Sequence, residues 1–277
     1  MGTSRDMGFV NTLHNRVEAL AHMPVLAGVA QRQALAEFKA NKDQNLFYGV
    51  YPTWAEAEAS AAAYGAVGYD NSASAQLYVH RMRLDTYDYP SLYWIGRSMA
   101  EGMSSVFDVG GSIGIKYYAF LEPLSRTPVA RWLVEDVPAV VDYGRQFARE
   151  RGTQERLQFT SQFSDGDGLD LLFASGVVQY LPETLGTLLK NYRHLPKRIV
   201  VNTAAIHPVH DFFTVNSTGV AFCPYRVQTQ GAFIRGLTAL GYRLRESWVN
   251  TGKKLTIPHQ PQYSLSDYSG FCLDLKT

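Results

Sequence analysis

The chain has 277 residues, of which 46% are hydrophobic and 13% aromatic. This length and composition can bury a sizeable core, which excludes a wholly disordered protein and fits one large domain or one domain with a smaller attachment. Lysine and arginine total 26 against 25 for aspartate and glutamate, a formal net charge of +1. Such a balance offers no global field for a phosphate backbone, so we expect no nucleic-acid partner.

The cysteine and hydropathy patterns indicate a compartment. Cys223 and Cys272 are far apart and have no CxxC companion. They support neither a zinc site nor a disulfide framework, and they favour a reducing, cytoplasmic location. The longest early apolar run, residues 23–30, contains Pro24. It is far shorter than the roughly 20 residues that a membrane helix needs, so we expect no membrane partner.

The first third of the chain has the pattern of short helices. Apolar residues recur at helical spacing over residues 12–45, and Thr53 with Glu56 forms a capping box that predicts a helix start. Aromatic residues then crowd residues 64–94. Such residues typically pack small helices onto a larger body, and the alternative is a lid over a ligand.

From about residue 104, short apolar runs alternate with helical segments. This alternation predicts a largely parallel α/β sheet wound on both faces. The predicted strands are 105–109, 130–135, 157–162, 170–174 and 198–202. The predicted helices are 115–121, 139–151, 183–195 and 230–240. Two last strands, 242–249 and 270–275, are typical of an antiparallel hairpin at a sheet edge.

The strongest motif is Val-Phe-Asp-Val-Gly-Gly-Ser-Ile-Gly, an apolar strand that runs into a glycine-rich turn and then a helix. Glycines at the carboxyl end of a first parallel strand let the backbone approach a nucleotide-like ligand. The nicotinamide fingerprint G-x-G-x-x-G needs glycine where the chain has Val109. Methyl-transferring enzymes favour an acid followed by G-x-G-x-G, which Asp108, Gly110 and Gly114 match, with Ser112 as the middle residue. The motif predicts a cofactor cradle, and a tight structural turn is the alternative.

An acidic pair, Glu135 and Asp136, follows the second predicted strand and precedes Pro138. In doubly wound folds a carboxylate at this point accepts hydrogen bonds from ribose hydroxyls, and either residue is suited to this role. The alternative is a solvated helix N-terminus, where acids and a first-turn proline are favoured.

With these motifs the chain resembles class I S-adenosylmethionine-dependent methyltransferases, especially small-molecule O-methyltransferases with D-V-G-G-G-x-G and D-L-P-H-V. It resembles more closely a bacterial group of methyltransferases with Gly-Val-Tyr-x-x-Trp-x-x-Ala, Gly-Tyr-Asp, D-x-G-G-S-x-G and Ser-x-x-x-Gln-Tyr-Leu segments, all found within residues 45–250. The resemblance implies a Rossmann-like seven-stranded sheet, mostly parallel with an antiparallel last strand. This domain would cover residues 96–277, after an N-terminal helical cap of residues 1–95.

The resemblance also implies a cofactor and a reaction. The cofactor is S-adenosylmethionine, whose methyl group would move to an oxygen or nitrogen of a small-molecule or sugar-like acceptor. Residues 161–163 are expected at the adenine, with an ordinary strand end as the alternative. A homodimer is left open. The residues implied around the cofactor are Asp108, Gly110, Gly111, Ser112, Gly114, Glu135, Asp136, Ser161, Gln162, Phe163, Ser175 and Gln179.

One departure from the family concerns the catalytic base. Many plant-type O-methyltransferases carry a histidine where this chain has Gln179, and glutamine takes up no proton at neutral pH. His207 and His210 are the remaining candidates for substrate or proton handling. Their spacing beside Asp211 also resembles half of a metal site, but no further cluster completes it, so we expect no metal. Ordinary loop histidines are the third alternative.

The candidate acceptor contacts are Tyr69, Asp70, Tyr180 and Arg226. Arg226 belongs to residues 207–230, which mix polar anchors with aromatic walls as a small-molecule pocket does, although a long crossover that only packs is the alternative. Two other function classes remain open. Val109 speaks against a nicotinamide-dependent oxidoreductase, whereas a non-catalytic binding protein with a nucleotide fold stays open because no base is secure.

Overall fold

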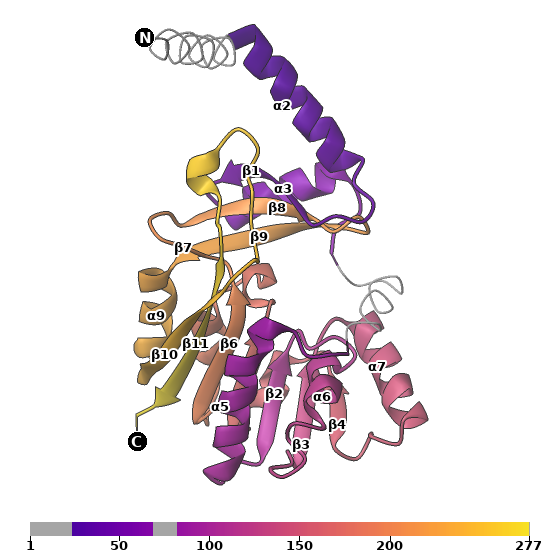
Figure 1. Ribbon diagram of the computed structural model, residues 1–277, viewed down its shortest axis with the longest axis vertical. Helices are drawn as coiled ribbons and strands as arrows, with labels where there is room; N and C mark the ends of the chain where they lie inside the picture. Colours follow the sequence, from indigo (N-terminus) through magenta and orange to yellow (C-terminus); the bar gives the residue numbers. More distant parts are fainter. Residues whose placement is uncertain (1–23, 69–81, 277) are drawn as a thin grey trace, which may run out of the picture.

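The computed structural model describes residues 24–68 and 82–276, which form two β-sheets with helices around them. Figure 1 shows the smaller sheet above one end of the larger sheet. The larger sheet has seven strands in the order β10-β11-β6-β5-β2-β3-β4. Its strands are β2 (Ser105–Val109), β3 (Arg131–Glu135), β4 (Leu157–Thr160), β5 (Leu171–Ser175), β6 (Arg198–Ala204), β10 (Tyr242–Asn250) and β11 (Tyr268–Leu275).

The pairing of these strands confirms the predicted fold class. The pairs β2–β3, β2–β5, β3–β4 and β5–β6 are parallel, whereas β11 is antiparallel to both of its neighbours, β6 and β10. The last strand of the chain therefore lies inside the sheet, between β6 and the edge strand β10. Parallel order brings the carboxyl ends of β2, β3, β4, β5 and β6 to one edge, where ligands bind in open α/β sheets.

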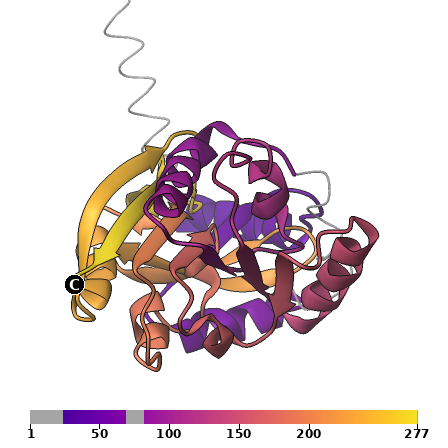
Figure 2. The same ribbon diagram turned by 90° about the horizontal axis from the view of Figure 1, so that it is seen from below.

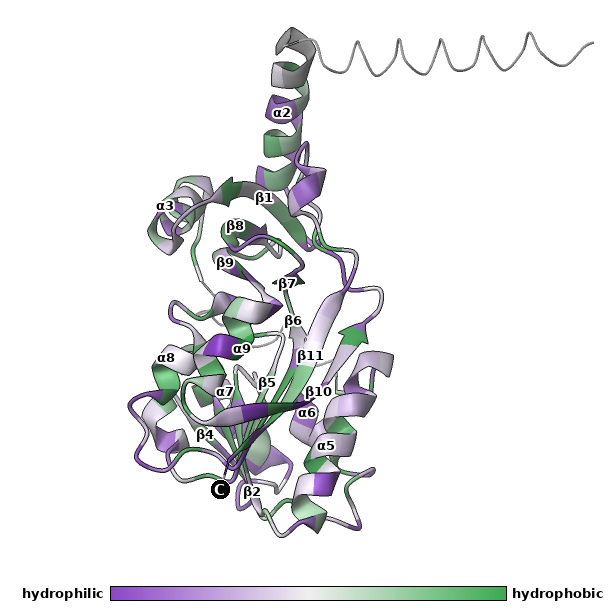
Figure 3. Ribbon diagram, turned by 90° about the vertical axis from the view of Figure 1, so that its left-hand side faces the viewer, coloured by the Kyte–Doolittle hydropathy of each residue, from purple (hydrophilic) through white to green (hydrophobic). Residues whose placement is uncertain are grey.

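Helices cover both faces of the larger sheet, as the view from below shows (Figure 2). Figure 3 places α5 and α6 on one side of the strands and α8 and α9 on the other. The central strands are buried throughout because both faces are covered: all five residues of β2 and all seven of β6 are buried, and most of them are apolar. The covering helices are α5 (Tyr89–Ala100), α6 (Ile115–Phe120), α7 (Pro138–Glu150), α8 (Leu185–Leu189) and α9 (Gln230–Thr238).

The smaller sheet has the order β1-β8-β9-β7 and combines two distant parts of the chain. Its strand β1 (Leu46–Tyr51) pairs antiparallel with β8 (Phe212–Ser217), which pairs with β9 (Phe222–Thr229). The two-residue β7 (Ile206–His207) completes it. The N-terminal region was expected to be a helical cap and residues 207–230 a loop-like crossover. The structure differs in part: residues 24–68 contain two helices but also β1, and residues 207–230 contain β8 and β9 of the same sheet.

Two N-terminal helices accompany this sheet: α2 (Pro24–Lys39) and α3 (Trp54–Tyr64). The predicted helix start at Thr53 is confirmed, since the Thr53 hydroxyl accepts a hydrogen bond from the Glu56 N–H at 3.3 Å. The apolar side of α3, with Ala57 and Ala61, packs with Val215 of β8. We call β1, β7, β8, β9 and α3 the cap. Among the described residues, no helix is long and apolar enough to span a membrane.

Candidate functional site

The glycine-rich turn lies at the carboxyl end of β2, and three of its residues have a left-handed backbone conformation. Gly110, Ser112 and Gly114 have φ angles of +62°, +54° and +85°. A Cβ atom at Gly110 would lie 2.3 Å from Val177 Cγ2, and one at Gly111 would lie 2.4 Å from Asp108 Oδ2. These two glycines are therefore required by the close packing of the turn itself, whether or not a ligand is bound.

The acidic pair at the end of β3, which belongs to the second sequence motif, contacts this turn. The Ser112 N–H donates to Asp136 Oδ2 at 2.8 Å, and the Val137 N–H donates to Asp136 Oδ1 at 2.8 Å. The Gly110 N–H donates to the Glu135 carbonyl at 2.8 Å. Parallel pairing of β2 with β3 sets Val109 opposite Glu135 and thereby aligns the two motifs. The carboxylate of Asp136 is thus fixed at the turn.

Asp108, Glu135 and Asp136 form an acidic cluster at this edge. Asp108 is only 1% exposed, and its Oδ2 accepts a hydrogen bond from Trp132 Nε1 at 2.9 Å. Burial raises the pKa of Asp108 to about 7 against the opposing Trp132 hydrogen bond, and the charge of Asp136 adds to the rise. Burial, with Asp136, also raises the pKa of Glu135 to about 7. A positively charged ligand beside this cluster would favour the ionised acids.

The predicted adenine segment has a mixed outcome. Ser161 and Gln162 follow β4 and are exposed, so both are accessible at the sheet edge. The ring of Phe163 instead packs inward, with its centroid 5.4 Å from that of Phe107 and 5.4 Å from that of Tyr192. Phe163 is half-buried, and its contact with adenine stays a prediction.

The segment after β5 runs from the glycine turn to the cap. Ser175 ends β5 and is half-buried. Val177 packs on Gly110, and Gln179, which is 4% exposed, donates from Nε2 to the Thr203 carbonyl at 3.2 Å. Tyr180 then reaches the cap, because its hydroxyl donates to Asn216 Oδ1 at 2.8 Å.

Of the other predicted acceptor contacts, Tyr69 and Asp70 lie outside the described residues. Arg226 of β9 is half-buried, with its guanidinium 4.9 Å from the Phe213 ring centroid, and its Nη2 donates to the Pro182 carbonyl at 2.6 Å. Burial lowers its pKa. These contacts join the cap to the loop after β5.

The two candidate histidines lie at the edge of the cap. His207 Nδ1 accepts from the backbone N–H groups of Val209 and His210 at 3.1 and 2.9 Å, and Nε2 lies 3.0 Å from the Gln262 carbonyl. Because Nδ1 accepts, the ring proton is on Nε2 and donates to Gln262. Burial lowers the pKa of His207, which favours this neutral form. Both ring nitrogens thus have backbone partners, which argues against His207 as a base.

His210 packs its ring on His207 and Tyr263, with centroids 5.0 Å apart in each case. Asp211 accepts a hydrogen bond from the Thr229 N–H at 2.6 Å. Within residues 24–68 and 82–276, no three histidine, cysteine or acidic side chains gather as a metal site.

Sequence reasoning missed a polar group that fixes the segment before α5. Asn202 near the end of β6 and Asn250 at the end of β10 both donate to the Tyr87 carbonyl, at 3.1 and 3.4 Å. The neighbouring Asp88 is fully buried, and Lys116 of α6 lies 2.7 Å from its Oδ2. The available signal was the position of each asparagine at the end of a strand. The Asp88 pair has no such signal, since its two residues belong to different elements.

No protein-family model and no curated protein sequence matches the chain. Solved structures are similar in fold. OxaC has a TM-score of 0.50 at 16% identity, covering 75% of this chain and 52% of its own. Magnesium protoporphyrin IX methyltransferase (ChlM) from Synechocystis PCC 6803 with bound SAH has 0.45 at 12%, covering 89% and 100%. Mitomycin 7-O-methyltransferase MmcR has 0.42 at 18%, covering 68% and 54%.

The likeness to OxaC is one of fold alone at this level of identity. The chain has the α/β methyltransferase fold, with a seven-stranded sheet whose strand β11 is antiparallel. It spans about half the length of OxaC and of MmcR. Other structures of OxaC hold SAH with oxaline, or sinefungin with meleagrin.

Proposed function

We propose that the chain is an S-adenosylmethionine-dependent methyltransferase that acts on a small-molecule or sugar-like acceptor. The observation that carries the proposal is the acidic cluster of Asp108, Glu135 and Asp136 around the left-handed turn after β2. S-adenosylmethionine combines a sulfonium cation, an amine and two ribose hydroxyls, all of which a carboxylate cluster stabilises.

The residues at this edge fit such a cofactor. Asp136 is held at the turn by the Ser112 N–H, in the place where doubly wound folds bind ribose. Ser161 and Gln162 are accessible beside it for polar contacts to adenine. When bound, the cofactor supplies a methyl group that its positive sulfur has already activated. The protein then has to hold the acceptor in line and exclude water, and the cap lies over this edge (Figure 1).

This proposal extends to the organisation of the chain. Residues 96–277 would carry the methyltransferase domain, and residues 1–95 would contribute the N-terminal part of the cap. A cytoplasmic location is part of the same proposal and rests on the two buried cysteines, Cys223 and Cys272, which are far apart in the sequence and have no CxxC companion.

Calorimetric titration tests the proposal with three ligands: S-adenosylmethionine, S-adenosylhomocysteine and NAD. We expect both adenosyl compounds to bind and NAD to give no heat. Asp136→Asn removes a charged hydrogen-bond acceptor and should weaken S-adenosylmethionine binding by about tenfold or more. The matched control is Asp142→Asn on the exposed side of α7, where the carboxylate only pairs with Arg145 at 3.5 Å, and this variant should bind as the wild type does.

Two outcomes would contradict the proposal. Binding of NAD without heat from S-adenosylhomocysteine would indicate the nicotinamide-dependent alternative, despite the buried valine at position 109. No binding of any of the three ligands would favour a non-catalytic protein that retains the nucleotide fold.

A further inference from the structure

Gln179 carries a buried polar atom that the described residues leave unsatisfied. Its side chain is 4% exposed, and its Nε2 donates to the Thr203 carbonyl at 3.2 Å. This bond fixes which end of the amide is the donor, so Oε1 is the other end. Oε1 is buried and has no hydrogen-bond partner within residues 24–68 and 82–276. A buried carbonyl oxygen without a donor costs about 1–3 kcal/mol, which a bound donor would recover.

The backbone that holds Gln179 is itself strained. Thr203 has a φ of +49°, although a β-branched residue rarely adopts the left-handed region. The pairing of β6 with β11 changes register near this residue, as it does at a β-bulge. Asn250 Oδ1 accepts from the Thr203 N–H at 3.0 Å, while the Thr203 carbonyl accepts from Gln179. Bulges and strained residues of this kind concentrate at functional sites.

Gln179 also lies where the proposed transfer would occur. Val177, two residues earlier, packs on Gly110 of the glycine turn. Tyr180, the next residue, is bonded to Asn216 of the cap at 2.8 Å. Gln179 therefore belongs to the short segment that joins the turn proposed for the cofactor to the cap.

We infer that Gln179 Oε1 faces the transferred methyl group and accepts a hydrogen bond from the N–H of an amine acceptor. This inference rests on the methyltransferase function proposed above and assigns the acceptor class as a neutral amine. In the reaction the nitrogen lone pair forms the new N–C bond, the C–S bond breaks, and its electron pair stays on sulfur. Nitrogen keeps its proton as an ammonium ion, which later releases it to water.

The amide oxygen suits this reaction because it needs no base. As nitrogen becomes positive, its hydrogen bond to Oε1 becomes charge-assisted and stronger, so the interaction favours the transition state over the ground state. A hydroxyl acceptor would instead have to lose its proton during transfer, and glutamine cannot take it. An ionised phenolate has no proton to donate, and both Oε1 and the acidic cluster would repel it. An amine is therefore the methyl acceptor that both donates a hydrogen bond to Gln179 Oε1 and reacts without a base.

Sinefungin is a direct probe of this geometry. It is a cofactor analogue in which a carbon that bears an amine replaces the methyl-bearing sulfur, so its N–H groups stand at the point of transfer. We compare its affinity with that of S-adenosylhomocysteine, which has no group there, by calorimetry. Gln179→Met keeps the length of the side chain but removes Oε1 together with the Nε2 donor to the Thr203 carbonyl. It should weaken sinefungin by about tenfold or more and leave S-adenosylhomocysteine unchanged.

Two further variants complete the test. Gln179→Glu keeps an acceptor oxygen and should retain the wild-type preference for sinefungin. Gln146→Met, on the exposed side of α7, is the matched control and should bind both ligands as the wild type does. An equal change in both affinities for Gln179→Met, or no change in either, would overturn the role of Oε1. If the wild-type protein binds neither ligand, the proposed function itself fails.

Discussion

At the scale of single residues, Asp108 and Glu135 should make the folding stability of the unliganded protein and its affinity for S-adenosylmethionine change with pH in opposite directions. Both folded-state pKa values lie at about 7, above the ordinary values of 3.8 and 4.5, so the folded protein binds these protons more tightly than the unfolded chain. The unliganded protein should therefore be more stable at pH 5.5 and lose stability as the pH rises to 8. Affinity for S-adenosylmethionine should rise over the same interval because the ionised acids attract the sulfonium.

Thermal denaturation and calorimetry between pH 5.5 and 8 measure both effects. Asp108→Asn preserves the shape of the side chain and an oxygen for the Trp132 hydrogen bond, so it should flatten both profiles in part. Asp142→Asn, whose carboxylate is exposed, should leave the wild-type profiles intact. A melting temperature that increases with pH, and does so less in Asp108→Asn, would contradict the assigned direction.

Residues of the candidate site could be predicted where they belong to a motif that is recognisable in the local sequence. Asp136 follows a strand and precedes a proline, and the structure places it at the glycine-rich turn, where it accepts from the Ser112 N–H. Ser112 stands where the related motif has glycine, and its φ of +54° shows that the conformation is kept without the residue best suited to it. The partners of His207 and the orphan oxygen of Gln179 were not predictable, because both depend on contacts between segments far apart in the chain.

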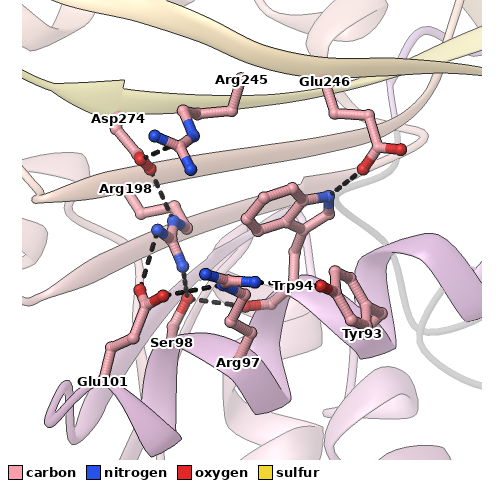
Figure 4. Close-up of polar contacts among 9 residues, drawn as sticks. All are labelled: Tyr93, Trp94, Arg97, Ser98, Glu101, Arg198, Arg245, Glu246 and Asp274. Atoms are coloured by element: carbon pink, nitrogen blue, oxygen red, sulfur yellow. Dashed lines mark hydrogen bonds and ion pairs between the residues drawn. The ribbon is translucent and has the colours of Figure 1, made fainter.

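At the scale of elements, Arg198 at the start of β6 joins three of them (Figure 4). Its guanidinium lies 2.7 Å from Asp274 of β11 and 3.0 Å from Glu101, the residue after α5. It also donates to Ser98 Oγ at 3.0 Å. Its side chain is 4% exposed, so its removal leaves carboxylates that are partly shielded from water without their cation.

Arg198→Met should lower the free energy of unfolding by about 2–3 kcal/mol, somewhat less than for a fully buried pair because Glu101 is partly exposed. The same network provides a control: Arg245 is 34% exposed and lies 3.3 Å from Asp274. Arg245→Met should cost less than about 1 kcal/mol. Urea unfolding curves of the three proteins measure both values. If both variants lose less than about 1 kcal/mol in the free energy of unfolding, Arg198 contributes no more than a surface ion pair does.

Some helices and strands can be predicted from their local sequence, whereas others depend on a partner that is distant in the chain. Strands such as β2 and β6 are short, mostly apolar segments covered on both faces, and this pattern is local. Strand β1 was missed because it is short and mostly half-buried, and because its partner comes late in the chain: Leu46 pairs with Ser217. No periodicity within residues 1–95 could indicate a strand added from such a distance.

At the scale of the whole molecule, Asn216 of β8 links the cap to the site. Its Nδ2 donates to Asn45 Oδ1 at 2.7 Å and to the Leu46 carbonyl at 3.0 Å, while its Oδ1 accepts from the Tyr180 hydroxyl. One fully buried amide thus joins the start of β1, the middle of the cap sheet and the segment that carries Gln179. The cap is held over the carboxyl edge through this residue.

Asn216→Ala should therefore loosen the cap without unfolding the larger sheet. It removes three hydrogen bonds of a buried amide, and we expect a loss of about 2–3 kcal/mol in the free energy of unfolding. Hydrogen exchange should accelerate in β1 and in residues 178–180 while β2 and β5 keep their protection, since local opening follows local contacts. Gln33→Ala on the exposed side of α2 is the control and should exchange as the wild type does. Uniform acceleration across both sheets would mean that cap and sheet open as one unit, and Asn216 would then stabilise the fold as a whole rather than the position of the cap over the site.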